Sequence, residues 1–294
     1  MQKVAIIVLN FNKRHDVLAC LKSVYQLDYP SYEVIVVDNA STDGSQDAVR
    51  DLFPDAHLIC NETNLGAPGG RNVGIDYAEK HFDFDAVLFL DNDAIVEPAF
   101  LKHLTSAVEA KKDVGIAGGK AFMEYPSTTI MSTGLDVNFY TGFIGDIGSG
   151  KQDQGQFDEE RVVPAYGGFG LLVEKEVLQE LKGFDDHFNP YGWGEVDLCL
   201  RAKDLGYKTL YVPSAIIYHK GCKVGRGPIP HYEKHKTKNY LFLMRRHAKG
   251  FQKVTVFISL FVRGVFRFIV LAIRGQFSVI GAQLRGFLEG IVRK

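Results

Sequence analysis

Residues 87–93 read Val-Leu-Phe-Leu-Asp-Asn-Asp, an apolar run that stops on two carboxylates, Asp91 and Asp93, separated by one residue. Such a run is typical of a strand buried on both faces, and open α/β sheets bind their ligands beyond the carboxyl ends of their strands. Two carboxylates this close repel each other unless a cation lies beside them, and a hard divalent ion is the usual partner. The other interpretation is that both aspartates only cap the strand and open a turn before Glu97.

The first 115 residues alternate between strand and helix patterns. Apolar runs predict buried strands at residues 4–9, 33–37 and 86–90, and residues 57–60 predict a weaker strand. Apolar residues at helical spacing predict helices between them, at residues 18–25, from a cap at 41–43 through 49, and at 72–80 after a glycine-rich turn. This alternation indicates an α/β fold with a mostly parallel central sheet and right-handed crossovers.

Regularity weakens after residue 120. The patterns there predict two helices and two short strands, at residues 173–181, 197–205, 208–212 and 215–218. Five glycines between residues 141 and 155 indicate a loop that is able to move. The second half of the chain thus departs from the strand–helix alternation of the first half.

Polar side chains follow each of the four predicted strands. They are Asn10 and Asn12, then Asp38, then Asn61 and Asn64, then Asp91 and Asp93. Because the carboxyl ends of parallel strands meet at one edge of a sheet, these side chains predict a polar crevice of the kind that binds nucleotides. Between the third and fourth strands, Gly66, Gly69 and Gly70 allow close backbone approach to a ligand, and Arg71 supplies a planar cation.

Two common nucleotide-binding patterns are missing. Gly119-Lys120 lacks the earlier glycine and the hydroxyl residue of a P-loop, and Asn10-Phe11-Asn12 stands where a dinucleotide-binding GxGxxG would follow the first strand. The crevice therefore belongs to another kind of nucleotide site.

Six segments in order closely resemble the family 2 glycosyltransferases with a GT-A fold. They are VAIIVLNFN, VIVVDNASTDGS, NLGAPGGRNVGI, LFLDNDAIVEP, GGFGLLVEKEVLQELKGFDD and DLCLRAKDLGYKTLYVPSAIIYH. The resemblance covers residues 3 to about 247 and is closest to the rhamnosyltransferase-like branch. It implies a Rossmann-like GT-A domain at 1–249, with a nucleotide-binding half at 1–115 and an acceptor-binding half at 116–249.

The resemblance also implies roles for individual residues. A nucleotide-sugar donor is expected at Leu9, Asn10, Asn12, Asp38, Asn64, Gly70, Arg71, Asp91 and Asn92. Among these, Asp38 and Arg71 are expected to hold the base and Asp91 the ribose. Asp93 and His219 are the implied ligands of Mg²⁺ or Mn²⁺, which neutralises a diphosphate leaving group.

Each of these roles has a plainer alternative. Asp38 also fits an Asx-type cap on the turn at 41–43, and Arg71 fits an ordinary salt bridge. A lone His219 at the end of a strand is commonly structural. The cations Lys220, Lys223 and Arg226 that follow it fit either phosphate binding or a solvated basic loop.

Transfer with inversion needs one base and no covalent nucleophile. The family usually shows Glu-Asp-x-Asp where this chain reads Gly194-Glu195-Val196-Asp197, so the first acid is absent and the second is a glutamate. We expect Glu195 to be the base, with Asp197 as the second candidate or as a cap of the following helix.

The acceptor is expected on the same side of the crevice. The resemblance places it near Gly167 and Gly168, which allow close approach, and near Trp193. Trp193 fits a stacking platform for a sugar and fits core packing equally well.

The C-terminal end of the chain is strongly basic. Residues 220–294 hold 16 Lys and Arg against two Glu, a balance of +14, so the net charge of −1 leaves −15 for the other 219 residues. Arg263, Arg267, Arg274 and Arg285 fall within about 40° on a helix, beside a broad apolar face. The segment 250–294 therefore reads as basic amphipathic helices that lie on an anionic membrane, with the arginines reaching toward lipid phosphate.

Alternatives exist for this C-terminal segment. The two arginines inside residues 254–273 each cost about 2.5–3.5 kcal/mol at the centre of a bilayer, so a spanning helix is not favoured. A helix bundle or a dimer interface with an arginine rim is the other reading. Nucleic-acid binding explains the charge but not the apolar character, and no oligomeric state can be read from the sequence.

The expected function is that of an inverting, metal-dependent glycosyltransferase in envelope polysaccharide synthesis. It would move a sugar, with rhamnose as one candidate, from a nucleotide-sugar donor to a glycan or lipid-linked acceptor. Four scattered cysteines and the lack of a signal pattern favour a reducing cytoplasm, at the inner face of the cell membrane. A catalytically inactive sugar-nucleotide-binding protein and a sugar-nucleotide nucleotidyltransferase are the alternatives, the second disfavoured by Asn10-Phe11-Asn12-Lys13.

Overall fold

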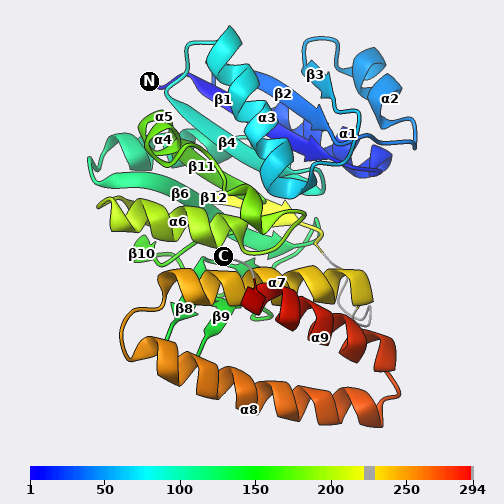
Figure 1. Ribbon diagram of the computed structural model, residues 1–294. Helices are drawn as coiled ribbons and strands as arrows, with labels where there is room; N and C mark the ends of the chain where they lie inside the picture. Colours follow the sequence, from blue (N-terminus) through cyan, green and yellow to red (C-terminus); the bar gives the residue numbers. More distant parts are fainter. Residues whose placement is uncertain (222–228, 293–294) are drawn as a thin grey trace.

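The computed structural model describes residues 1–221 and 229–292, and in this part of the chain one ten-stranded sheet is flanked by helices (Figure 1). The strands of the first half are β1 Val4–Asn10, β2 Tyr32–Asp38, β3 His57–Cys60, β4 Ala86–Asp91, β5 Ala94–Val96 and β6 Val114–Met123. Those of the second half are β7 Ile130–Ser132, β8 Leu135–Asn138, β9 Phe143–Asp146, β10 Arg161–Val163, β11 Gly170–Glu174 and β12 Lys208–His219.

Nine α-helices and one short 3₁₀ helix lie in the described residues. The first four are α1 Arg14–Val24, α2 Ser45–Leu52, α3 Gly66–His81 and α4 Phe100–Glu109. The next are α5 Lys175–Leu181, the 3₁₀ helix η1 Asp186–Phe188, and α6 Gly194–Asp204. The last three are α7 Pro230–His247, α8 Gln252–Ile273 and α9 Phe277–Val292.

The strand order of the main sheet is β10-β12-β6-β11-β4-β1-β2-β3, with β5 and β7 at its side. The four strands predicted for the first half, β1 to β4, are present and pair in parallel. Asn10 lies opposite Asp38 and Leu9 opposite Asp91, so the polar strand ends do meet at one edge. The second half adds antiparallel β11 between β4 and β6.

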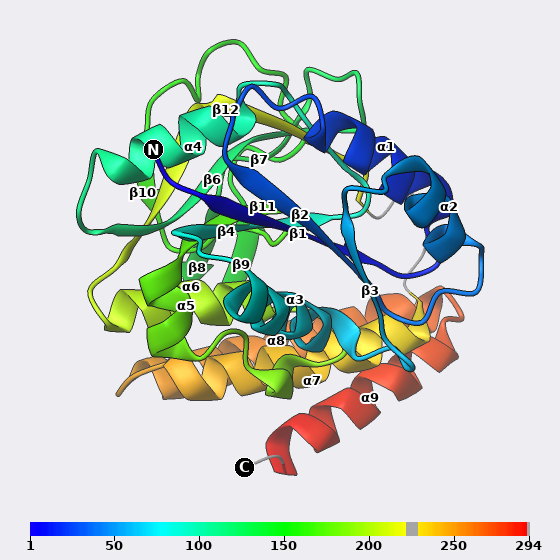
Figure 2. The ribbon, with the colours of Figure 1, turned by 90° about the horizontal axis from the view of Figure 1, so that it is seen from above.

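Helices cover both faces of this sheet. Figure 2 shows α1 and α4 on one face and α3, α5 and α6 on the other. Val4–Val8 of β1 and Ala86–Leu90 of β4 are therefore buried at every position. This double burial explains why these strands read as continuous apolar runs rather than alternating ones.

The sequence predicts a turn for the glycine-rich segment before Asn72. In the structure this segment forms the first turns of α3, which begins at Gly66. Pro68 is tolerated in the first turn of α3, because a backbone N–H at that place would have no partner within the helix. The glycines let the helix approach the sheet: a Cβ at Gly70 would lie 2.4 Å from Leu9 Cδ1, and one at Gly74 2.7 Å from Ile7 Cγ2. They serve packing between helix and sheet.

Other boundaries in the second half also differ from the prediction. Val173 belongs to β11, so the helix predicted from that residue begins only at Lys175. The two short strands predicted around Pro213 form one strand, β12, with an irregularity in its pairing to β6. Part of the loop predicted at 141–155 is strand β9, paired with β8 in a hairpin.

Figure 1 shows the C-terminal helices on one side of the sheet and its helices, with α9 beside α7 and α8 farther out. The α7–α9 contact is close because of two glycines. A Cβ at Gly286 would lie 2.2 Å from the Lys234 carbonyl oxygen, and one at Gly290 3.0 Å from that of Lys238. Arg245 Nη1 donates to the Gly290 carbonyl at 2.9 Å, which joins the two helices further.

Helix α8 has the length and apolar composition that would let a helix cross a membrane, with a mean hydropathy of 2.3 and little burial. Its arginines, however, do not point away toward lipid phosphate as predicted. Arg263 donates to the Thr141 carbonyl before β9, and Arg267 pairs with Glu233 of α7 at 2.7 Å. Both side chains stay exposed, but each is paired with an acceptor of the protein, so these two arginines face the protein.

Candidate active site

The carboxyl ends of β1 and β2 are joined by a network of polar side chains. Asp38 is buried, and it accepts hydrogen bonds from the side chains of Asn10 and Gln46 and from the Ser41 backbone N–H, each at 2.8 Å. Asn92 Nδ2 donates to Asn10 Oδ1 at 2.9 Å, which ties the network to the turn after β4. The Asx-type turn at Asp38 is thus present, and base binding by Asp38 stays a prediction.

Two more asparagines support turns along the same edge. Asn12 Oδ1 accepts a hydrogen bond from the Thr42 backbone N–H at 2.7 Å. Asn64 Oδ1 accepts one from the Gly66 N–H at 2.8 Å, at the start of α3. Both residues lie around the predicted crevice, and their side chains already shape its backbone.

An aspartate pair and a histidine meet across the sheet. Asp91 ends β4, Asp93 lies in the following turn, and His219 ends β12. One ligand atom from each lies within 4.8 Å of the other two. His219 Nε2 is 2.9 Å from Asp93 Oδ1 and 3.7 Å from Asp91 Oδ2. The pairing of β5 with β12 sets His219 opposite Ala94, so the backbone register creates this cluster.

The cluster is partly buried and strongly coupled. Burial opposes charge on Asp93 and on His219, but their hydrogen bond and the attraction of nearby opposite charges together outweigh it, so the pKa of Asp93 is lowered and that of His219 is raised. The charge of Asp91 raises the pKa of His219 further. The imidazole stacks on Phe169 at 4.7 Å, and Gly167 makes room for that ring, which a Cβ would approach to 2.4 Å.

These three residues fit a divalent cation. Carboxylate oxygens suit Mg²⁺ and Mn²⁺, and imidazole suits transition-metal ions. His219 Nδ1 is buried, and none of the described residues offers it a hydrogen-bond partner. Asp91, Asp93 and His219 are therefore a candidate metal site, as the sequence predicted for two of them.

Arg71 on α3 connects this cluster to the other side of the crevice. Its buried guanidinium pairs with Asp91 Oδ1 at 2.9 Å through Nη2 and with Glu195 Oε1 through Nη1. Gly168 makes room for the pair, because a Cβ there would lie 2.5 Å from Arg71 Nη2 and 2.7 Å from Glu195 Cγ. The salt-bridge interpretation of Arg71 thus holds, and its contact with a base stays a prediction.

The Arg71 contact controls the charge of Glu195. Burial opposes ionisation of this carboxyl, but the positive charge and the hydrogen bond of Arg71 outweigh burial and lower the pKa of Glu195. The same pair raises the pKa of Arg71. Glu195 is therefore ionised at neutral pH, the form in which a carboxylate is able to accept a proton.

Trp193 precedes Glu195 at the start of α6 and has a left-handed backbone, with φ of 71°. This conformation costs on the order of 1–3 kcal/mol for a residue with a side chain, and such strain gathers at functional sites. Trp193 Nε1 donates to the Lys236 carbonyl at 3.1 Å, and its ring lies 5.5 Å from that of Tyr240. The indole thus packs against α7, and stacking on a sugar stays a prediction.

Asp197, the second candidate base, is fully buried beside two arginines and a histidine. Its carboxylate lies 2.7 Å from Arg201 Nε, 2.8 Å from His247 Nε2 and 3.3 Å from Arg246 Nη1. The alternative, that Asp197 caps α6, is wrong, because the helix begins three residues earlier at Gly194. The carboxylate instead joins α6 to α7.

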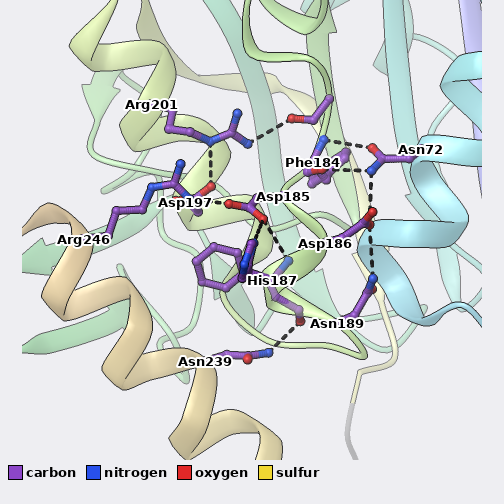
Figure 3. A network of polar contacts seen from close by, with 12 residues as sticks. Asn72, Phe184, Asp185, Asp186, His187, Asn189, Asp197, Arg201, Asn239 and Arg246 are labelled. Carbon is purple, nitrogen blue, oxygen red and sulfur yellow. Dashed lines mark hydrogen bonds and ion pairs between the residues drawn. The ribbon is translucent and has the colours of Figure 1, made fainter. Parts of the chain in front are cut away.

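Figure 3 shows the larger polar network that includes Asp197 and ties α7 to the segment before α6. Arg246 pairs with Asp185 at 2.5 Å, and Asp185 also accepts from the His187 N–H at 2.8 Å. Burial opposes the charge of Asp185, but these partners lower its pKa to about 2. Asn239 Nδ2 donates to the Phe188 carbonyl at 2.6 Å. Sequence patterns did not indicate the contacts to α7, because Asn239 and Arg246 lie 51 and 61 residues from their partners Phe188 and Asp185.

Of the three cations that the sequence analysis considered for phosphate binding, the structure describes only Lys220. Lys220 pairs with Asp16 at 3.0 Å, which is a contact to α1. Lys223 and Arg226 lie outside the described residues. The phosphate-binding interpretation of this segment therefore gains no support from Lys220.

The sequence matches known glycosyltransferases. Residues 2–250 match a family model described as "Glycosyltransferase like family 2". An N-acetylglucosaminyl-diphospho-decaprenol L-rhamnosyltransferase of Mycobacterium tuberculosis is 28% identical over 235 residues, which cover 73% of this chain and 75% of that protein.

The fold matches solved glycosyltransferases. Mannosyltransferase PcManGT from Pyrobaculum calidifontis, solved with GDP-Man and Mn²⁺, aligns with a TM-score of 0.61 over 99% of this chain and 87% of that one, at 16% identity. S. aureus TarS 1–349 in complex with UDP-GlcNAc aligns with a TM-score of 0.62 over 95% and 79%, at 15% identity. The expected GT-A fold is confirmed, and the chain belongs to family 2 of the glycosyltransferases.

Proposed function

We propose that this chain is a metal-dependent, inverting glycosyltransferase that moves a sugar from a nucleotide-sugar donor to a lipid-linked acceptor. One observation carries the proposal. Arg71 pairs with Asp91 of the candidate metal cluster and with Glu195 on the other side of the crevice. The proposed metal cluster and the proposed base are thereby linked through one side chain, and a displacement between two bound substrates needs such groups at a fixed spacing.

The donor is proposed to bind along the strand ends. Asp91, Asp93 and His219 would hold Mg²⁺ or Mn²⁺, and the ion would neutralise charge on the diphosphate leaving group. A related fold has been solved with GDP-Man and Mn²⁺, which supports such a donor complex. The network of Asn10, Asp38 and Asn92 would keep the β1 and β4 ends rigid beneath the nucleoside.

Glu195 is proposed as the base. It would accept the proton of the acceptor hydroxyl as that oxygen attacks the anomeric carbon of the donor, while the bond to the diphosphate breaks. Because Arg71 lowers the pKa of Glu195, the carboxylate is ready to accept this proton at neutral pH. Asp197, buried among Arg201, Arg246 and His247, is proposed as a positioning residue that holds α6 against α7.

The acceptor is proposed to be attached to a lipid at the cytoplasmic face of a membrane. The Mycobacterium tuberculosis relative is named for a diphospho-decaprenol substrate and for L-rhamnose, which makes rhamnose one candidate sugar. On α8, Ile258, Val262, Phe266, Ile269 and Ile273 are all exposed, and an exposed apolar area of this kind marks an interaction surface. Peripheral attachment through this face would bring the active site to its acceptor.

A thermal-shift screen of nucleotide sugars, with and without Mn²⁺, tests the proposal. We expect one donor to raise the melting temperature, and only when the ion is present. Slow metal-dependent hydrolysis of that donor would then separate an enzyme from an inactive binding protein. Donor binding without any hydrolysis or transfer would favour the inactive protein and contradict the proposal.

A further inference from the structure

A large cavity lies among the C-terminal helices and does not belong to the crevice at the strand ends. It has a volume of about 980 Å³ and lies between α8 on one side and α7 with α9 on the other. Figure 1 shows α7 and α9 side by side and α8 farther out, and Arg267 of α8 pairs with Glu233 of α7. Pockets for small molecules measure roughly 300–1,000 Å³, so this cavity can hold a sizeable ligand.

The lining of the cavity is mostly apolar, and its charged side chains are mostly cationic. From α8 come Phe257, Leu260, Phe261, Val265 and Phe268, and from α9 come Ile280, Leu284 and Phe287. Lys236, Arg263 and Arg267 supply positive charge, and Glu233 the only negative charge of the lining. Glu233 is itself paired with Arg267 at 2.7 Å, which leaves the lining with a net positive charge.

Trp193 links the cavity to the active site. The indole is part of the cavity lining, and it stands two residues before Glu195 at the start of α6. Its neighbour Tyr240 lines the cavity as well, and the Tyr240 hydroxyl donates to the Gly142 carbonyl beside Arg263. A ligand in the cavity would therefore lie against Trp193, two residues before the proposed base.

We propose that this cavity binds the hydrocarbon chain of the lipid-linked acceptor, with Lys236 and Arg263 near the phosphate that joins chain to sugar. The inference rests on the proposed function, because it assigns the acceptor of that same site. A long apolar chain gains from the Phe and Leu lining, and its phosphate suits the cationic side chains at the Trp193 end. A peptide is a poorer occupant, because its backbone groups need hydrogen-bond partners that such a lining lacks.

Gly264 offers a way to fill the cavity. It lines the cavity from α8, and a Cβ placed on it meets no atom within 4 Å, so a larger side chain has space there. Glycine is also a poor residue in a helix interior, so replacement does not weaken α8. Gly281 on α9 is a matched control, because its Cβ position is equally open and it does not belong to the lining.

The single tryptophan makes the experiment direct, since Trp193 fluorescence reports from the cavity itself. The full chain is titrated with farnesyl phosphate below its aggregation concentration, and with isopentenyl phosphate and inorganic phosphate. We expect a saturable blue shift with farnesyl phosphate and at least tenfold weaker binding of the two short probes. Gly264→Phe should weaken farnesyl phosphate binding at least tenfold, Gly264→Ala less, and Gly281→Phe less than twofold.

Several results would overturn the inference. These are the absence of saturable binding to the wild-type chain, or equal affinity in Gly264→Phe when circular dichroism and melting temperature show that it is folded. Equally tight binding of dihexanoyl phosphatidylglycerol would assign the cavity to bilayer lipid instead. The titration contains no donor, metal or sugar, so its failure leaves the proposed transfer reaction untouched. Conversely, if the chain binds farnesyl phosphate but no nucleotide sugar in the thermal-shift screen, the cavity would not be the site of a transfer acceptor.

Discussion

The candidate catalytic edge of the sheet carries charges away from water, and the outer face of α8 carries apolar side chains in water. The two regions differ in whether this chain supplies partners for these groups. At the edge the charges are buried but matched, with Arg71 between Asp91 and Glu195. On α8 the side chains of Phe266 and Ile273 stay 70% and 81% exposed. Unpaired buried charge costs several kcal/mol, and at this edge Arg71, Asp91 and Glu195 are partners for one another. Exposed apolar area of this extent points to completion by another surface.

Removing the proposed base should break the catalytic edge most severely. Glu195→Gln keeps the size of the side chain but cannot accept the acceptor proton, and a general base contributes about 10²–10⁴-fold. We expect turnover to fall by that factor while the donor still raises the melting temperature. Glu176→Gln, at an exposed position on α5, is the control. Near-normal turnover of Glu195→Gln would refute the assignment.

Loss of a metal ligand should come next in size. Asp93→Asn removes the charge that pairs with His219 at 2.9 Å, and with it part of the candidate metal site. Since a bound ion contributes several kcal/mol of charge stabilisation and 1.36 kcal/mol is tenfold, activity should fall on the order of 10²-fold. The Mn²⁺-dependent thermal shift should disappear, whereas exposed Asp136→Asn on β8 should keep it. A persisting shift in Asp93→Asn would place the ion elsewhere.

The outer face of α8 can be tested without touching the cavity. Phe266 and Ile273 lie seven residues apart on α8 and are not part of the cavity lining. Changing both to Glu should weaken sedimentation with anionic vesicles at least tenfold, because apolar area is lost and charge is added. Leu52→Glu with Val162→Glu, also exposed, is the matched control. Equal vesicle binding by both double variants would mean that α8 does not attach the protein.

The smallest effect is a shift in pH dependence. In Gly168→Ala the new Cβ would lie 2.5 Å from Arg71 Nη2, so the Arg71–Glu195 pair must separate. Arg71 lowers the pKa of Glu195, so a weaker pair raises it, and the base is lost by protonation at higher pH. The acid limb of the kcat/KM profile should move to higher pH, and it should not move in Gly281→Ala. An unchanged acid limb in Gly168→Ala would mean that protonation of Glu195 does not cause this limb.

Much of the donor side could be predicted from the sequence. The strands β1, β2 and β4 are apolar runs because helices cover both faces, and each ends on a polar residue. Parallel pairing then brings Asn10, Asp38 and Asp91 to one edge by register alone. The glycines before Asn72 were assigned to a turn, because glycine signals a turn and a close helix–sheet contact equally well.

The remaining parts depend on contacts that no local pattern encodes. Arg71 and Glu195 are 124 residues apart, and their pairing depends on the space left by Gly168. The inward direction of Arg263 follows from the Thr141 carbonyl, which the helical spacing of α8 could not indicate. The α7–α9 contact likewise depends on Gly286, whose helix partner is more than forty residues away.

The most direct measurement is the anomeric configuration of the transferred sugar, read by proton NMR on product made with and without a divalent cation. A single displacement assisted by Glu195 predicts the configuration opposite to that of the donor, formed only when Mg²⁺ or Mn²⁺ is present. Retained configuration, or equal transfer in the presence of a chelator, would contradict a metal-dependent inverting reaction at Asp91, Asp93, His219 and Glu195.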